Sequence, residues 1–318
     1  MLQMKEMPYH CGLKVKIYPS NEQKRLIAVN DGVKRAVYNH LVACGNEKYR
    51  LNKCASFVPA YQQRLSYLET VTGALCNIKN ALPFLYGRDV DEQAIANAIR
   101  NYQTAWKNMK QQHRGVPVFK KKSAEQSYQT NAHYYSKKTA SGHNSNVRFE
   151  DSSHVVLPKL GRIRFAGSPK LVKEVLEHQS DIRIGAIQIS RDAVGEYWAS
   201  FQLGSELPFR DTLPKTGSEQ GLDLNLLELV NDSDGGSCEN KRFLRLAEDK
   251  LAKEQHMLSR MAEHAKKESR KLSDSKNYQQ QRKKWPAFIG RWFAREKITF
   301  ISSRSGKSRA KTSSLRRI

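Results

Sequence analysis

The sequence predicts an α+β protein in which a helical domain is inserted into a β-barrel-like domain and a shorter domain follows. Three changes of pattern predict this class. Apolar residues first alternate with lysines, as in a half-buried strand, then recur at helical spacing, and from residue 113 alternate again. These changes divide the chain into residues 1–19 as the first barrel strand, 20–112 as the helical domain, 113–212 as the rest of the barrel, 213–284 as the third domain, and 285–318 as a basic tail.

The first strand is expected over residues 11–18, where Lys14 and Lys16 alternate with apolar residues. Ser20 or Asn21 can then cap a helix, because both side chains accept hydrogen bonds from the first free N–H groups. Further helices are expected up to about residue 109, and the best defined of them begins at Asp91 and carries Trp106.

Strands are expected again from Val116–Phe119 onward. Residues 155–157 and 163–165 flank Pro158–Gly161, which is typical of a hairpin. A second hairpin is expected from residues 182–190 and 197–203, and a linker from Thr212 to Gln220.

The charge of the chain points to a polyanionic partner. The 318 residues include 55 Lys and Arg against 31 Asp and Glu, a net charge of +24. Nucleic acid is the leading candidate, because many cations are needed to neutralise many phosphates, and a ribosome-associated or anionic-membrane protein is the alternative. No apolar run of the length that spans a bilayer and no signal peptide is visible, so a cytoplasmic protein without a membrane partner is expected. The five cysteines form no C-x-x-C pair, so no zinc site is predicted.

Residues Gly221–Gly236 suggest a buried strand with Asp223 in its middle, followed by a turn at Asp234–Gly236. A buried carboxylate is costly unless it is paired or holds a metal ion, as in two-metal nucleases. A long helix is expected next, from about residue 241 to residue 276.

Taken in order, these segments resemble the TnpB family, the OrfB-type proteins of bacterial insertion sequences. The similarity rests on the runs YPSNEQKRLI, VKRAVYNHLV, VPVFKKKSAEQSYQTN, IQISRDAVGEYWASFQL and GLDLNLLELVNDSDGG, and extends over about residues 12–284. The type V CRISPR effectors are more distantly similar. The resemblance implies a helical recognition lobe inserted in a wedge-like β-barrel, a guide RNA, a double-stranded DNA target beside a short motif, and a RuvC-like nuclease domain of RNase-H fold.

The third domain departs from this family. Asp223 matches the first RuvC carboxylate, but Asn225 stands where the family has glycine. Two metal ions need about three converging carboxylates, and after Glu268 the only acids are Asp274 and Glu296. We therefore predict a truncated RuvC-like domain with Asp223 as a remnant, no metal, and no cofactor apart from the bound guide RNA.

Candidate nucleic-acid contacts are basic and polar side chains in three places. Lysines suit phosphates, tyrosine suits base stacking, and glutamine and asparagine suit adenine. A solvated basic loop or an ordinary helix surface is the alternative in each case. The candidates are Lys14, Lys16, Lys34 and Arg35 for the guide RNA, Gln93 and Asn97 on the Trp106 helix, and Lys120, Lys121, Lys122, Gln126, Ser127, Tyr128 and Thr130 after it.

The predicted function is an RNA-guided, nuclease-inactive DNA-binding protein that represses transcription by blocking RNA polymerase, similar to the TnpB-derived repressors called TldR. It is expected to act as a monomer on one guide RNA, in the bacterial cytoplasm at the nucleoid. Two alternatives stay open. One is an active RNA-guided DNA endonuclease, and the other is a degenerate transposon protein that binds nucleic acid without specificity.

Overall fold

The computed structural model describes residues 4–54, 58–73, 75–123, 125–135, 145–166, 169–178, 181–209, 221–223, 227–240 and 242–282. The chain forms two compact units, Met1–Arg210 and Asp211–Ile318. The predicted linker, residues 212–220, and the predicted basic tail, residues 285–318, lie outside the described residues.

The helices of the first unit begin with α1 (Asn21–Leu51), which is one uninterrupted helix. Ser20, one of the two predicted candidates, caps it, and it does so in a capping box with Gln23. The remaining helices are α2 (Pro59–Gly73), α3 (Leu75–Ala81), the short 3₁₀ helix η1 (Pro83–Tyr86) and α4 (Glu92–Gln112). Asp91 caps α4 through its side chain, so both predicted helix starts are confirmed.

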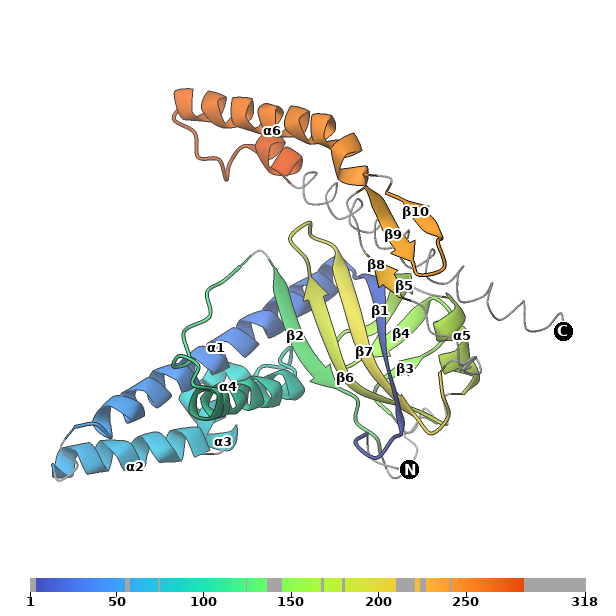
Figure 1. Cartoon of the computed structure of the whole chain (residues 1–318). Helices are drawn as coiled ribbons and strands as arrows, with labels where there is room; N and C mark the ends of the chain where they lie inside the picture. Colours follow the sequence, from blue (N-terminus) through green and yellow to red (C-terminus); the bar gives the residue numbers. More distant parts are fainter. Residues whose placement is uncertain are drawn as a thin grey trace. The chain divides into compact units, whose positions relative to one another are not determined.

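In the described part of this unit, seven antiparallel strands form one sheet in the order β2-β6-β7-β1-β5-β4-β3 (Figure 1). The strands are β1 (Tyr9–Tyr18), β2 (Gln126–Asn131), β3 (Arg148–Phe149), β4 (His154–Leu157), β5 (Gly161–Ala166), β6 (Ile182–Arg191) and β7 (Tyr197–Ser205). Both predicted hairpins are present, as β4–β5 and β6–β7. The first strand of the chain lies in the middle of the sheet, between β7 and β5.

The two edges of the sheet approach each other, which gives it a barrel-like form. Tyr134, just after β2, forms a bridge with Ser145, just before β3. Next to it, the N–H of Asn146 donates to the carbonyl of His133 at 3.2 Å. The sheet encloses one apolar core, which Ile27 of α1 and Val172 of α5 (Pro169–Glu177) complete. Helix α5 was not predicted from the sequence.

The strand expected at Val116–Phe119 is not formed. Residues 113–123 have no regular structure and connect α4 to β2 across the surface of α1 (Figure 1). Alternation of apolar residues predicted a strand here, but within the described residues this segment has no strand partner.

The second unit contains a small antiparallel sheet in the order β10-β9-β8, formed by β8 (Leu222–Asp223), β9 (Glu228–Asp232) and β10 (Ser237–Glu239). The predicted turn is present, and Gly235 adopts a φ of +80° that favours glycine. Asp223, however, is exposed, so its predicted burial is wrong. The described part of β8 is two residues at the edge of the sheet, which leaves the carboxylate open to solvent.

Helix α6 (Phe243–Lys267) is shorter than expected. It ends because Ser269 takes a left-handed conformation with φ +53°, and the N–H of Arg270 returns to the carbonyl of Ala265. Leu272, expected on this helix, lies beyond it and is 39% exposed. Among the described residues, we find no helix with the length and apolar character needed to cross a membrane.

Candidate nucleic-acid interface

A buried acid on α1 organises the cations around it. Asp31 is 8% exposed, and its carboxylate lies 3.6 Å from the ammonium of Lys34 and 3.4 Å from the guanidinium of Arg35. Spacings of three and four residues place all three side chains on one helix face. The same carboxylate accepts a hydrogen bond from the N–H of Ser127 at 3.0 Å, so it also joins α1 to the edge strand β2.

Lys34 strengthens that junction. Its ammonium donates to the carbonyl oxygen of Ser127 and, at 3.2 Å, to the hydroxyl of the same residue. A lysine ammonium has three hydrogens, so these bonds and the contact with Asp31 use its donors within the protein. Lys34 therefore supplies positive charge to the site from a fixed position.

The crossing segment, residues 113–123, is fastened to α1 by Asn39. The Asn39 side-chain amide donates to the carbonyl of Lys120 at 3.0 Å, and its oxygen accepts from the N–H of Lys120 at 2.8 Å. The ammonium of Lys120 lies 3.9 Å from the centre of the Tyr38 ring. Burial lowers the pKa of Lys120, and the nearby charge of Lys34 lowers it further.

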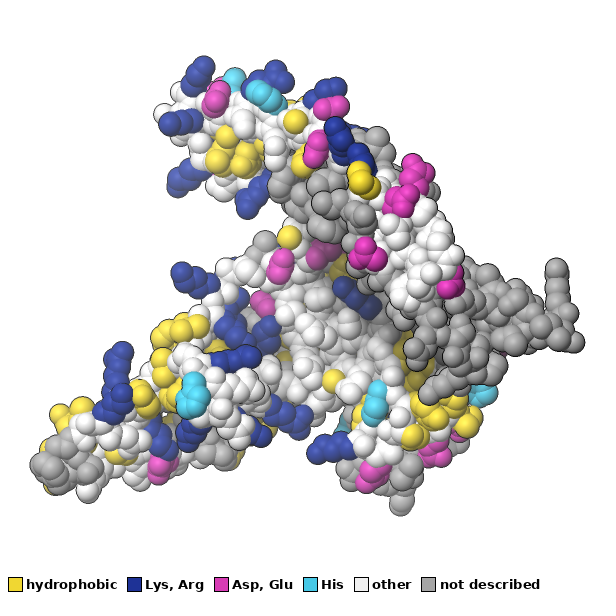
Figure 2. Space-filling model, in the orientation of Figure 1, with side chains coloured by type: hydrophobic (Ala, Val, Ile, Leu, Met, Phe, Trp, Pro, Cys, Tyr) yellow, Lys and Arg dark blue, Asp and Glu magenta, His cyan; other side chains and the backbone are white. Residues whose placement is uncertain are grey.

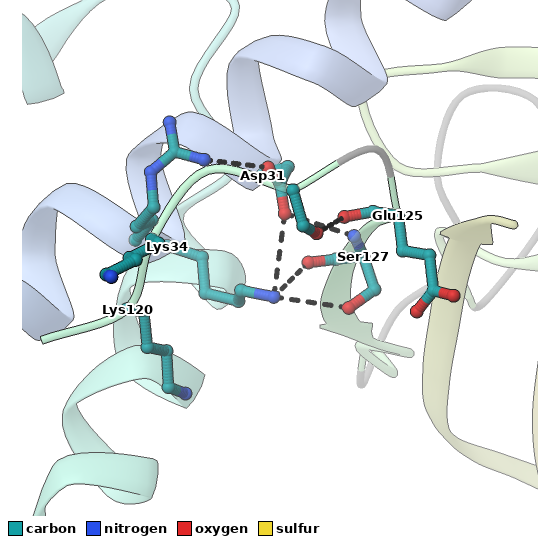
Figure 3. Close-up of a pocket in the computed structure, with 8 residues that line it drawn as sticks. Asp31, Lys34, Lys120, Glu125 and Ser127 are labelled. Carbon is teal, nitrogen blue, oxygen red and sulfur yellow. Dashed lines mark hydrogen bonds and ion pairs between the residues drawn. The ribbon is translucent and has the colours of Figure 1, made fainter. Parts of the chain in front are cut away.

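These contacts surround a hollow of about 340 Å³ between α1 and the start of β2 (Figure 3). Its lining has four basic and two acidic side chains, so positive charge is in excess. The basic hollow is lined by Asp31, Lys34, Arg35, Lys120, Lys121, Ser123, Glu125 and Ser127. Lys and Arg side chains gather where the crossing segment passes α1 (Figure 2). A surface of this kind suits phosphate groups, which accept from ammonium and guanidinium donors.

Within the predicted run of three lysines, the side chains have different surroundings. Lys121 and Lys122 are exposed and are free to meet a phosphate in solution. Lys120 is exposed as well, but its ammonium lies against the Tyr38 ring. Gln126, predicted beside them, is half-buried at the start of β2.

The base-reading role predicted for three residues needs correction, because all three are buried. Asn97 is 5% exposed and donates to the carbonyl of Gln129 at 2.9 Å. Tyr128 and Thr130 are 1% and 0% exposed, and burial raises the pKa of Tyr128 far above its usual range. Tyr128 belongs to the core that the sheet encloses, and Asn97 joins α4 to β2. Gln93 is half-buried and accepts from the side chain of Asn131 at 3.1 Å, so it also belongs to that junction.

The two lysines of β1 are not among the residues that line the hollow. Lys14 is exposed, with its ammonium 4.9 Å from the centre of the Trp198 ring. Lys16 forms an ion pair with Glu196 at 2.5 Å, and that hydrogen bond raises the pKa of Lys16. Their predicted contact with a guide RNA stays a prediction.

Sequence reasoning missed two residues that build this site. Asp31 had a readable signal, because an acid three and four residues before two cations predicts helix ion pairs. Asn39 had none, because its partner is 81 residues away and bonds through the main chain.

In the second unit, Asp223 pairs through its main chain with Asn231 of β9. No group of three His, Cys, Asp or Glu residues that would hold a metal ion occurs within the part of the chain that the structure describes. All five cysteines lie among the described residues, and each is a free thiol.

Comparison with known proteins finds one matching family model and two curated relatives. Residues 7–54, which hold β1 and α1, match the helix-turn-helix domain of the OrfB proteins of IS605 type. The chain is 24% identical over 275 residues to InsQ of Escherichia coli, named as an RNA-guided DNA endonuclease, covering 85% of this chain and 56% of that protein. It is also 24% identical over 213 residues to a protein of Paramecium bursaria Chlorella virus 1 named as a transposase, covering 66% of this chain and 45% of that protein.

The chain thus spans about half the length of the curated relatives it matches. A solved CRISPR-Cas12f ternary complex matches with 11% identity over 89% of this chain and 62% of that chain. The TM-score of 0.33 does not establish a shared fold. Residues 7–54 are thus similar to an OrfB-type helix-turn-helix domain, although they fold as one strand and one long helix, and the chain has weak sequence similarity to a protein named as an RNA-guided DNA endonuclease.

Proposed function

We propose that this protein binds a guide RNA and a double-stranded DNA target as an RNA-guided DNA-binding protein, and that it does not cut the DNA. The observation that carries the proposal is the basic hollow. Lys34 and Arg35 come from α1, within the OrfB-type segment, and Lys121 comes from the segment that Asn39 fastens to it. The net charge of +24 and the similarity to a protein named as an RNA-guided DNA endonuclease support the same function.

The basic surface suits an RNA-guided protein because base pairing reads the sequence in such systems. The protein then needs mainly to hold the backbone and the shape of the nucleic acid. Lysine and arginine contacts to phosphate do this without choosing a sequence. The monomer would bind one guide RNA, and occupancy of a promoter would block RNA polymerase.

The nuclease-inactive part of the proposal rests on the surroundings of Asp223. The carboxylate is exposed at a sheet edge, and its partner across the strands is Asn231, an amide rather than a second acid. Two-metal cleavage needs carboxylates that converge on the ions. Within the described residues, an exposed acid that faces an amide across the strands does not by itself provide that arrangement.

Two experiments test the proposal. Purification of the full chain from cells, followed by sequencing of bound RNA, should recover one discrete RNA whose variable end pairs with the target. The purified complex should then bind that target in magnesium buffer and leave it intact. Recovery of no discrete RNA would overturn the guided function.

The active endonuclease is the second candidate, favoured by the name of the relative from Escherichia coli. It predicts magnesium-dependent cutting that Asp223→Ala abolishes. The binding proposal expects wild type and Asp223→Ala to bind equally and to cut nothing.

A further inference from the structure

The crossing segment presents three large apolar side chains to solvent, Val116 at 44% exposure and two adjacent ones that are more exposed. Val118 is 73% exposed and Phe119 is 56% exposed. Removing such side chains from water is favourable, so a partner surface that covers them gains binding free energy. We call Val118 and Phe119 the apolar tip.

The apolar tip is held in place by its neighbours. Lys120, the next residue, is fixed through both main-chain polar groups by Asn39, and its ammonium sits on the Tyr38 ring. Tyr38 is 6% exposed and packs edge-on against Tyr102 at 6.4 Å between ring centres. On the other side, Pro117 is buried. The apolar tip therefore projects from an anchored backbone. Because this backbone is already held in place, the segment loses less conformational entropy when a partner covers the tip.

Positive charge lies on both sides of the tip. Arg114 precedes it, Lys121 and Lys122 follow it, and all three are exposed. Residues 113–123 include no acid. A partner for this surface needs an apolar face bordered by negative charge, and a stack of bases between phosphates has that combination.

We propose that Val118 and Phe119 insert against the bases of double-stranded DNA and open a base step, while Lys121 and Lys122 bind the flanking phosphates. Apolar side chains between base steps unstack them, which costs free energy at each step. Contacts of the adjacent cations with phosphate offset that cost. The inference rests on the proposed nucleic-acid-binding function and adds a site on the protein that acts on DNA structure.

Short DNA duplexes carrying 2-aminopurine at successive positions provide the test, because the fluorescence of this base rises when it is unstacked. The full chain should raise the fluorescence at one or two positions. Phe119→Ala should lose most of that rise and weaken binding by about fivefold or more, the lower end of base–aromatic stacking. Phe119→Trp should keep both the fluorescence rise and the binding affinity, because tryptophan retains a flat apolar ring.

Phe84→Ala is the matched control, since Phe84 of η1 is 53% exposed and lies outside the crossing segment. It should change neither reading. An unchanged thermal midpoint for Phe119→Ala would show that the fold is intact, as expected for an exposed side chain. Binding without any fluorescence rise in wild type, or a full rise in Phe119→Ala, overturns the apolar tip alone. No DNA binding by wild type, with or without its co-purified RNA, overturns the proposed function as well.

Discussion

Asp31 on α1 and Ser127 on β2 are joined by a hydrogen bond of 3.0 Å from the Ser127 N–H to the Asp31 carboxylate. This bond ties the helix of the OrfB-type segment to the edge strand of the sheet. The same carboxylate lies against Lys34 and Arg35, so it holds two of the four cations of the basic hollow together. A phosphate that enters the hollow therefore meets cations that the fold has already positioned.

We expect Asp31→Ala to destabilise the first unit by about 1–3 kcal/mol, because it leaves the Ser127 N–H without its acceptor and removes the negative charge that faces Lys34 and Arg35. Asp31→Asn should cost less, since its amide oxygen still accepts from Ser127. Urea unfolding of both variants measures the difference. Equal stability of Asp31→Ala and wild type would show that the junction contributes little.

Local features of the fold were predictable from the sequence. Ser20 and Asp91 cap helices by bonding to residues two or three positions away, so the signal lies in a few neighbouring letters. The β4–β5 and β6–β7 hairpins are equally local, because each turn adjoins its strands. Helix α5 was missed because the helical signal of its nine residues is short.

Long-range partners were not predictable. Asn39 finds Lys120 and Asp31 finds Ser127 only after the chain has folded. The burial of Tyr128 and Thr130 had a signal that the prediction overlooked. Residues two apart on a strand share a face, so these two side chains point inward together from β2.

The salt dependence of DNA binding should identify the phosphate contacts. Lys121→Ala and Lys122→Ala should each weaken binding and reduce the slope of log affinity against log salt by about one. Lys173→Ala on α5 is the control, because Lys173 has 76% side-chain exposure and does not line the hollow. Titrations at several salt concentrations measure all three. A slope change equal to that of the control would contradict a phosphate contact.

Two glycines of α1 should respond to alanine in opposite ways. A Cβ at Gly45 would clash with the Tyr102 hydroxyl and lie 3.1 Å from both the Tyr102 ring and Trp106 Nε1, so Gly45→Ala should cost about 1–3 kcal/mol through overpacking. A Cβ at Gly32 would meet no atom within 4 Å. Gly32→Ala should therefore raise the free energy of unfolding by about 0.5–1 kcal/mol, because alanine favours the helix more than glycine does. Thermal unfolding of the two variants checks the sign of each change. A stable Gly45→Ala would mean that α4 shifts without cost.

Asp91 is a buried acid whose ionisation opposes folding. It is 4% exposed, and burial raises its pKa above the ordinary value of 3.8, although the nearby Thr130 hydroxyl and the hydrogen bond from the Gln93 N–H act in the other direction. The ionisable groups that face it are the Tyr128 hydroxyl and the Lys159 ammonium. The folded protein therefore holds the Asp91 proton more tightly than the unfolded chain does.

The stability contribution of that proton is fully present below pH 3.8 and is lost as the pH rises through the folded pKa. Asp91→Asn should remove this part of the pH dependence while keeping the helix cap, because asparagine caps as well as aspartate. The measurement is the free energy of unfolding of wild type and variant at a series of pH values. The difference should grow in favour of Asp91→Asn as the pH rises above 3.8. Asp89→Asn is the control, because Asp89 forms an exposed ion pair with Arg25. Parallel curves for wild type and Asp91→Asn would show that Asp91 titrates alike in the folded and unfolded chains.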